Sequence, residues 1–355
     1  SKGPGLWYIV TGNGRFLRAH TCHTDTSYNT QISVFTGSGC NSLSCVGGND
    51  NLCGTGSSFD WESISGIDYY ILVYGAGNTE RGDFRLSLED ISPINDYCNN
   101  MMQLNIGENR LGSTELATSD SFVSDCGPVS NRFGVWYIVT GNGRFLRAHT
   151  CHMDTRYDAQ ISVYTGVGCG SLSCVVGNSN SCSGNNGGSF GWEAQVGTNY
   201  YILVYGVGNN ERGEFRLSIE DITPANDMCT GAIGMPIRQQ MLGSTFSATS
   251  ESTTVSCPTT TGIATEISAT RSSLWYMIIG TGQPLVAHTC NSGTTYGAQL
   301  SVFTGNSCDS LTCVDGTNSL CPSSNSNMVT WESTLGMLYY VMVHGGDTRR
   351  ISSNE

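Results

Sequence analysis

Charged side chains, and lysine above all, are scarce in this sequence. Asp, Glu, Lys and Arg make up 13% of the 355 residues, and Lys2 is the one lysine beside fifteen arginines. Crosslinks that need a lysine amine are therefore excluded from the interiors of the domains. The formal net charge of −13 leaves no basic patch that could neutralise phosphates, so we expect neither nucleic-acid binding nor adsorption to anionic lipid.

Long apolar runs and helical periodicity are missing as well. No stretch of eighteen apolar residues occurs, so we expect no membrane span. No segment repeats apolar residues at the three–four spacing of an amphipathic helix, and no His-Glu-X-X-His, phosphate loop or nucleophile elbow is present. The sequence opens at Ser1 without a signal peptide. We expect a processed or excerpted secreted chain that is not an enzyme.

One stretch of the sequence occurs three times. Its middle copy begins at Trp136, and the other two begin at Trp7 and Trp275, so the starts lie 129 and 139 residues apart. Each copy belongs to a segment long enough to bury its own core. We predict three domains, called repeats 1, 2 and 3 below, at residues 1–94, 95–223 and 224–355. Repeat 1 lacks its N-terminal segment, and repeat 3 lacks its last strand.

Sixteen cysteines keep fixed intervals in the three repeats. Each repeat holds a quartet spaced by 18, 5 and 8 residues: Cys22, Cys40, Cys45 and Cys53; Cys151, Cys169, Cys174 and Cys182; and Cys290, Cys308, Cys313 and Cys321. Two further pairs, each 28 residues apart, precede the quartets of repeats 2 and 3: Cys98 with Cys126, and Cys229 with Cys257. Such spacing is typical of disulfides in an oxidising compartment, so we predict an extracellular or cell-surface protein.

The pairing of these cysteines can be predicted from repeat 1, which keeps its quartet although no cysteine pair precedes it. We therefore predict that each pair bonds to itself and that each quartet closes on itself. A closed loop of 28 residues would stabilise the fold by roughly 3 to 4 kcal/mol. Three connectivities remain open within a quartet. The shortest loops favour Cys22 with Cys40 and Cys45 with Cys53.

Short strands separated by Gly, Asn and Ser make up every repeat. In repeat 1 we expect strands at residues 7–10, 16–22, 31–37, 43–46, 69–74 and 84–89, with another opening at Trp61. Leu17, Ala19 and Thr21 alternate with more polar residues, as in a half-buried strand. We predict an all-β fold of antiparallel sheets packed as sandwiches, with about eight strands per domain.

Two polar patterns resemble functional sites. His20, Cys22 and His23 look like metal ligands, but a disulfide-bonded sulfur cannot act as a thiolate. We interpret the shared histidine as a strand-face residue that hydrogen-bonds a backbone group or a carboxylate. Trp61 and Glu62, repeated at 192–193 and 331–332, alternate across a strand. We therefore expect a core tryptophan and a solvated glutamate rather than the paired carboxylates of a glycosidase.

The repeats also carry a chain-long pattern of motifs. It contains Asn-Asp-X-Cys, Gly-Ser-Thr with Ala-Thr-Ser, Ala-His-Thr-Cys, Gln-Ile-Ser-Val-Tyr-Thr-Gly, Leu-Ser-Cys-Val, and Tyr-Tyr-Ile-Leu-Val-Tyr-Gly. This pattern resembles the bacterial pre-peptidase C-terminal domain and its tandem relatives in large secreted surface proteins. The resemblance implies a jelly-roll-like β-sandwich that attaches to something or spaces something. Some relatives bind calcium and fibrous or polysaccharide substrates.

Calcium is the one cofactor that we consider for this chain, and no other cofactor is expected. Asp25, Asp154 and Asp158 lie near the turn after the histidine strand, and Asp50 stands in an Asn-Asp-Asn run where the family carries Asn-Asp-Asp. Hard cations bind several carboxylate or carbonyl oxygens. The alternative for such residues is turn capping.

The function we expect is structural: a subunit of an extracellular filament, stalk or surface layer, built head-to-tail or by donor-strand assembly. The short connections near Pro93 and Pro224 predict a stiff rod that self-associates into a linear polymer. The alternative is an adhesion module that binds polysaccharide or matrix protein for a larger secreted protein. The Ser- and Thr-rich residues 247–261 are a candidate O-glycosylated or flexible loop.

Overall fold

The computed structural model describes residues 4–120, 126, 132–177, 182, 186–208, 211–250, 257, 272–291, 293–317, 319–321 and 327–345. The chain divides into two compact units, one made of Ser1–Thr140, Ala148–Phe190 and Asn199–Ile219, the other of Gly141–Arg147, Gly191–Thr198 and Glu220–Glu355. The boundary between the units runs through repeat 2. The division into three domains therefore stays a prediction, and each repeat is considered by itself.

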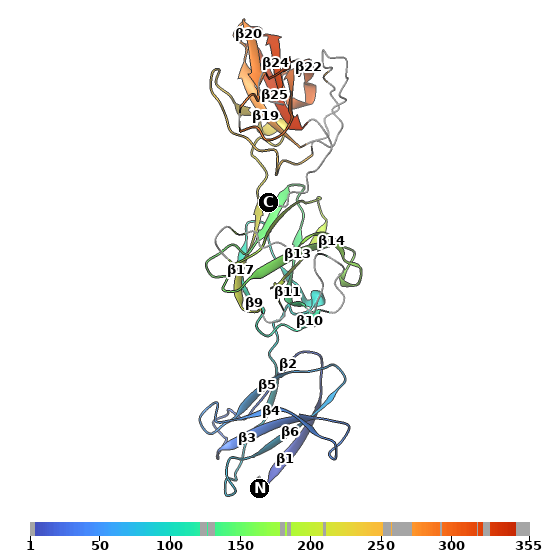
Figure 1. The fold of residues 1–355 in the computed structure, drawn as a ribbon, viewed down its shortest axis with the longest axis vertical. Helices are drawn as coiled ribbons and strands as arrows, with labels where there is room; N and C mark the ends of the chain where they lie inside the picture. Colours follow the sequence, from blue (N-terminus) through green and yellow to red (C-terminus); the bar gives the residue numbers. More distant parts are fainter. Residues whose placement is uncertain are drawn as a thin grey trace. The chain divides into compact units, whose positions relative to one another are not determined.

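The fold is all β, as predicted. The described residues form sheets whose strand pairs are antiparallel except for the short parallel pairings of Met102–Gln103 with Tyr137–Ile138 and of Ile233–Gly234 with Tyr276–Met277. They also contain four short 3₁₀ turns, η1 Cys98–Asn100, η2 Cys169–Ser171, η3 Cys229–Gly231 and η4 Cys308–Ser310, and no α-helix (Figure 1). No helix in this part of the chain has the length and apolar character needed to cross a bilayer.

Repeat 1, drawn in blue in Figure 1, consists of two sheets. The first has the order β1-β6-β3-β4, with β1 Gly5–Thr11, β6 Asp68–Gly75, β3 Thr30–Thr36 and β4 Ser44–Asp50. The second has the order β5-β2-β7, with β5 Ser58–Glu62, β2 Phe16–His20 and β7 Ser87–Asp90. The strand expected at residues 69–74 is β6, which pairs on both sides, whereas β1 is an edge strand.

The core of repeat 1 lies between these two sheets. Leu17 and Ala19 of β2 pack in one cluster with Ile32 and Val34 of β3 and with Trp61 of β5, and all five side chains are buried. The alternation read from the sequence is thus confirmed. The two sheets form a sandwich because each presents its apolar face to the other.

Repeat 2 has the same two sheets with extra strands. One sheet has the order β10-β11-β16-β13-β14, and β8 pairs with β11; the other has the order β15-β12-β17-β9. Their bounds are β8 Met102–Gln103, β9 Asn109–Ser113, β10 Ser119–Asp120, β11 Arg132–Thr140, β12 Phe145–His149, β13 Ala159–Thr165, β14 Ser173–Gly177, β15 Ser189–Glu193, β16 Asn199–Gly206 and β17 Glu214–Asp221. The strands β8, β9 and β10 come from the segment that precedes the repeated tryptophan.

Repeat 3 follows the same plan. Its sheets have the orders β18-β19-β25-β21-β22 and β20-β24-β23. The bounds are β18 Ile233–Gly234, β19 Ser273–Ile279, β20 Pro284–His288, β21 Ala298–Thr304, β22 Thr312–Gly316, β23 Ser319–Leu320, β24 Asn327–Glu332 and β25 Leu338–Gly345. The prediction that repeat 3 lacks its last strand concerns residues 346–355, which lie outside the described residues. Residues 251–256 and 258–261 of the candidate glycosylated loop lie outside them as well.

Two strand predictions need correction. Trp61 and Glu62 end β5 rather than opening a strand. The strand expected at residues 84–89 begins only at Ser87 in repeat 1, whereas its counterpart β17 is complete. The physical reason is a missing neighbour: β9 pairs with the first half of β17, from Glu214 to Ser218, and the described part of repeat 1 has no strand in that place.

The disulfide pairing also differs from the prediction. The first and fourth cysteines of each quartet bond to each other across 31 residues: Cys22–Cys53, Cys151–Cys182 and Cys290–Cys321. The cysteine pairs before repeats 2 and 3 bond to the two middle cysteines: Cys98–Cys169, Cys126–Cys174, Cys229–Cys308 and Cys257–Cys313. The predicted bonds Cys98–Cys126, Cys229–Cys257, Cys22–Cys40 and Cys45–Cys53 are therefore wrong, and Cys40 and Cys45 are free, exposed thiols.

The error arose from treating the quartet of repeat 1 as complete. Its middle cysteines have no partner among the described residues, because the bonding partners in repeats 2 and 3 belong to the segment before the tryptophan. Loop length also misled the prediction. The observed bonds Cys98–Cys169 and Cys126–Cys174 close loops of 71 and 48 residues, because spatial proximity and not chain distance decides which sulfurs meet.

Candidate functional site

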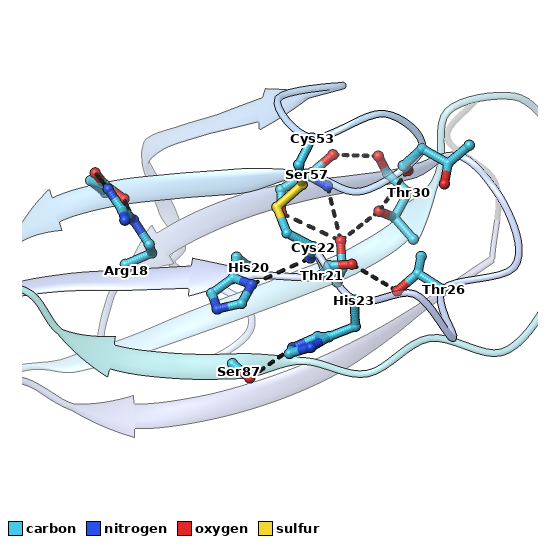
Figure 2. Close-up of a disulfide and its surroundings, with 12 residues drawn as sticks. Arg18, His20, Thr21, Cys22, His23, Thr26, Thr30, Cys53, Ser57 and Ser87 are labelled. Atoms are coloured by element: carbon cyan, nitrogen blue, oxygen red, sulfur yellow. Dashed lines mark hydrogen bonds and ion pairs between the residues drawn. A yellow bond between two sulfur atoms is a disulfide. The ribbon is translucent and has the colours of Figure 1, made fainter.

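The histidine pattern lies where β2 ends and the chain turns toward Cys22 (Figure 2). The backbone N–H of Cys22 donates to Nδ1 of His20 at 3.3 Å, and Nε2 of His20 lies 3.2 Å from Oε1 of Glu89. Because Nδ1 accepts, the proton of the neutral ring belongs on Nε2, which faces the carboxylate. His20 therefore joins a backbone amide to a carboxylate, as predicted for a strand-face histidine.

The same contact recurs in the other repeats. The N–H of Cys151 donates to Nδ1 of His149 at 3.3 Å, and the N–H of Cys290 donates to Nδ1 of His288 at 3.4 Å. In each repeat, a histidine two residues before the cysteine thus fixes the backbone of the first cysteine in the Cys22–Cys53 disulfide or its counterpart.

Buried threonines hold the other side of this turn. The hydroxyl of Thr26 donates to the carbonyl of Thr21 at 2.7 Å, and the N–H of Ser57 donates to Oγ1 of Thr21 at 3.0 Å (Figure 2). The Thr26 contact repeats at 2.7 Å from Thr155 to Thr150 and from Thr294 to Thr289. These bonds satisfy buried polar groups beside the disulfide, so the corner is built to hold a crosslink in place.

The second histidine does not complete a metal site. Nε2 of His23 lies 2.8 Å from Oγ of Ser87, and its ring stacks on that of His20 at 4.9 Å between centroids. Cys22 is bonded to Cys53 and cannot serve as a thiolate. In the part of the chain that the structure describes, no group of three or more His, Cys, Asp or Glu side chains is placed to hold a metal ion.

The four calcium candidates are dispersed, and two are paired with arginines. Asp25 lies 2.6 Å from Arg85, and Asp154 lies 2.6 Å from Arg216. Oδ2 of Asp50 accepts from the side-chain amide of Gln31 at 2.7 Å. Burial, and then the nearby charge of Glu211, raises the pKa of Asp158. The structure thus gives Asp25, Asp50 and Asp154 separate partners.

The Trp-Glu pairs divide between core and solvent as expected in repeats 1 and 3, whereas Glu193 of repeat 2 is half-buried and its Oε1 accepts from the backbone N–H of Ser250 at 3.1 Å. Trp61, Trp192 and Trp331 are each 4% exposed, whereas Glu62 and Glu332 are exposed. The tryptophans pack in the sandwich, so they offer no stacking platform for a sugar.

A feature that sequence reasoning missed is a second apolar core on the outer face of the larger sheet. In repeat 2 it contains Trp136, Ile138, Tyr164 and Leu203 together with the disulfide sulfurs of Cys98 and Cys126. Repeat 3 has the same arrangement around Trp275 and Phe303. We give the name covering segments to residues 95–131 and 226–272, of which the structure describes 95–120 and 126, and 226–250, 257 and 272.

Backbone pairing fixes the covering segment of repeat 2 to the sheet. Met102 of β8 pairs in parallel with Tyr137 of β11, and the N–H of Leu104 donates to the carbonyl of Ile138 at 2.9 Å. The side-chain amide of Asn95 donates to the carbonyl of Trp136 at 2.9 Å. The Asn-Asp-X-Cys motif thus has a physical meaning, since its asparagine and its cysteine both tie the segment to the sheet.

The corresponding face of repeat 1 is open. Trp7 is 51% exposed and Ile9 is 61% exposed, whereas their counterparts Trp136 and Ile138 are 0% and 8% exposed. Cys40 and Cys45, the counterparts of Cys169 and Cys174, are exposed thiols; Cys45 lies in β4 of the same sheet, and Cys40 lies in the turn before it. We call Trp7 and Ile9 of β1 together with Cys40 and Cys45 the open face. Leu6 and Tyr8 alternate with them and lie on the other side of β1, where their partners on β6, Val73 and Ile71, belong to the sandwich core. The sequence held the signal for the open face, since the quartet of repeat 1 has no preceding cysteine pair.

The comparisons with known proteins add no family. No family model matches the chain, and no curated protein matches it. Three solved structures align over part of it: a structure of allantoicase (13% identity, 61% of this chain and 77% of that chain, TM-score 0.19), an uncharacterised protein from Burkholderia cenocepacia (10%, 62% and 79%, 0.17), and the CUB1-EGF-CUB2 domains of rat MASP-1 (11%, 62% and 92%, 0.18). Similarity at this level identifies neither a family nor an activity.

Proposed function

We propose that this chain is a structural subunit of an extracellular filament, stalk or surface layer. The observation that carries the proposal is what the repeats share. Buried aromatic residues, a histidine–threonine corner and crosslinks at the same intervals recur from one repeat to the next. The carboxylate candidates, in contrast, change from repeat to repeat. Repetition of a crosslinked interior gives a chain mechanical length.

The seven disulfides seen in the described residues support the extracellular part of this proposal. Stable disulfides are typical of secreted and cell-surface proteins. With 13% charged residues, the protein has few surface ion pairs to stabilise it, so covalent crosslinks replace them as the reinforcement.

Electron microscopy of the purified chain over a range of concentrations tests this function. The proposal expects linear particles with a regular axial repeat, and their fraction should rise with concentration. Glycan arrays and matrix-protein arrays measure the alternative, adhesion. Particles that stay monomeric at every concentration and bind a defined glycan would replace the structural function with an adhesive one.

A further inference from the structure

We propose that the open face of repeat 1 is the docking site of a further covering segment. This occupant is a polypeptide stretch with the residue pattern of 95–131, and two disulfides hold it, from its first cysteine to Cys40 and from its second cysteine to Cys45. The inference goes beyond the proposed function, because it says what kind of polypeptide binds the open face and which bonds Cys40 and Cys45 form.

The backbone of repeat 1 already has the form that receives a covering segment. In repeat 2, β11 pairs with β16 in the register Trp136 to Leu203, and its other side pairs with β8 and β10. In repeat 1, β1 pairs with β6 in the equivalent register, Trp7 to Leu72, and is the edge strand of its sheet. An edge strand presents unpaired backbone groups to an incoming strand.

The side chains on both sides of β1 are also in the receiving arrangement. Tyr8 and Phe84 meet edge to face with ring centroids 6.4 Å apart, as Tyr137 and Phe215 do at 6.2 Å. The ring centroids of Trp7 and Phe35 lie 5.6 Å apart. These aromatic residues hold their positions while uncovered, so docking a segment needs little rearrangement of the sheet.

A glycine in the covering segment matches this arrangement. Gly112, in the Gly-Ser-Thr motif, lies against Tyr137 and Phe215, and a Cβ built there would collide with the tyrosine hydroxyl and the phenylalanine ring. Gly243 has the same relation to Tyr276 in repeat 3. Tyr8 and Phe84 form the same pair in repeat 1, so the incoming segment needs a glycine at this position.

The positions of Cys40 and Cys45 fix the orientation of the docked segment. Cys98 bonds to Cys169 and Cys126 bonds to Cys174. By repeat position, Cys40 corresponds to Cys169 and Cys45 to Cys174. Two bonds at two positions admit one orientation of the segment, which is the orientation that also lets β8 pair with the edge strand.

Bond formation needs an oxidant, for which glutathione disulfide suffices. The thiolate of Cys40 attacks one sulfur of glutathione disulfide and expels a glutathione thiolate, which leaves a mixed disulfide. The thiolate of the segment's first cysteine then attacks the Cys40 sulfur and expels the second glutathione thiolate. Two protein thiols are oxidised, and one glutathione disulfide is reduced to two glutathione molecules. Cys45 and the second cysteine react in the same way.

A second copy of this chain does not fit the open face. Its two covering segments are already bonded to their own repeats through Cys98, Cys126, Cys229 and Cys257. No third segment of this kind is present among the described residues. The occupant is therefore a covering segment beyond those two.

The test uses the whole chain and a synthetic, isotopically labelled peptide of residues 95–131 in a glutathione redox buffer. The expected product is one chain with one peptide and four fewer hydrogens. A non-reducing peptide map should join the labelled Cys98 to Cys40 and the labelled Cys126 to Cys45. Hydrogen exchange at residues 6–9 should slow in the product.

Matched variants separate docking from chance thiol chemistry. A peptide with Gly112→Val should crosslink about tenfold more slowly, because the added side chain would collide with the Tyr8–Phe84 pair. A chain with Ile9→Ser should also crosslink about tenfold more slowly, because docking no longer buries an apolar side chain there. Ile64→Ser is the control, because Ile64 is another exposed apolar residue of repeat 1, 65% exposed, outside the open face. Its rate should match that of the unchanged chain.

Three results would overturn the proposal: a Cys40–Cys45 bond that forms in preference to the peptide adduct, covalent dimers of the chain through these cysteines, or equal rates for the Gly112→Val and unchanged peptides. None of them excludes filaments, so this inference can fail while the proposed function stands.

Discussion

Asp96 accepts two hydrogen bonds from Thr118, one at each carboxylate oxygen. The backbone N–H of Thr118 donates to Oδ1 at 2.6 Å, and its hydroxyl donates to Oδ2 at 2.7 Å, with both residues buried. In repeat 3, Asp227 and Thr249 make the same pair of contacts. The aspartate of the Asn-Asp-X-Cys motif and the threonine of the Ala-Thr-Ser motif are thus joined within each covering segment.

Replacing Thr118 by valine tests the energy of this contact. Thr118→Val keeps the side-chain shape but leaves Oδ2 of Asp96 buried without that donor. We expect the free energy of unfolding to fall by about 1 to 3 kcal/mol, measured by chemical denaturation with the disulfides intact. Thr11→Val is the control, since Thr11 donates to Asp68 in an exposed pair, and its effect should stay within about 0.5 kcal/mol. Equal effects of the two variants would contradict this account.

The same aspartate predicts a pH dependence. Burial raises the pKa of Asp96, although the bonds from Thr118 oppose this shift. The folded state then binds the proton more tightly than the unfolded state, so the stability from this group is lower above the folded pKa and rises as the pH falls toward the unfolded value of about 3.9. Below that value it is constant.

Asp96→Asn removes this titration and keeps an acceptor for the N–H of Thr118. The difference in unfolding free energy between the unchanged chain and the variant should therefore move in favour of the unchanged chain as the pH falls. A difference that moves the opposite way would show that this carboxyl has a lowered pKa in the fold.

The strands could be predicted from the sequence because their signal is local. Leu17 and Ala19 alternate with Arg18 and His20, and that alternation follows directly from the geometry of a strand in a sandwich. The histidine corner could be interpreted correctly for a similar reason, since His20 and Cys22 are two residues apart.

The disulfides and the open face could not be predicted in this way because they depend on distant parts of the chain. Cys98 and Cys169 are 71 residues apart, and they meet in a fold in which β8 pairs with β11 and η1 contacts β11. The sequence around Trp7 does not indicate that this side chain is exposed, because it repeats the sequence around the buried Trp136 nearly letter for letter. What differs is the covering segment of residues 95–131, which precedes Trp136.

The two histidines of repeat 1 should differ in their effect on stability. His20→Ala removes the acceptor for the N–H of Cys22 and should lower the free energy of unfolding by about 1 to 2 kcal/mol. His23→Asn should change it by less than about 0.5 kcal/mol, since repeat 3 has Asn291 at this position. Thermal unfolding and the rate of reduction of Cys22–Cys53 measure both effects. A larger loss for His23→Asn would show that its contact with Ser87 supports the turn instead.

Removing one crosslink from the covered core tests what the covering segment contributes. The double variant Cys98→Ser with Cys169→Ser opens a loop of 71 residues, which the chain-entropy model values at about 4 kcal/mol. Hydrogen exchange at Trp136 and Ile138 should accelerate because the segment above them is held by one bond fewer. The matched control is Cys40→Ser with Cys45→Ser, which replaces free, exposed thiols and should leave the free energy of unfolding unchanged within about 0.5 kcal/mol. If the control destabilised the chain as much as the double variant, those two thiols would contribute to the fold of repeat 1 itself, and their assignment as receivers of a further segment would lose its basis.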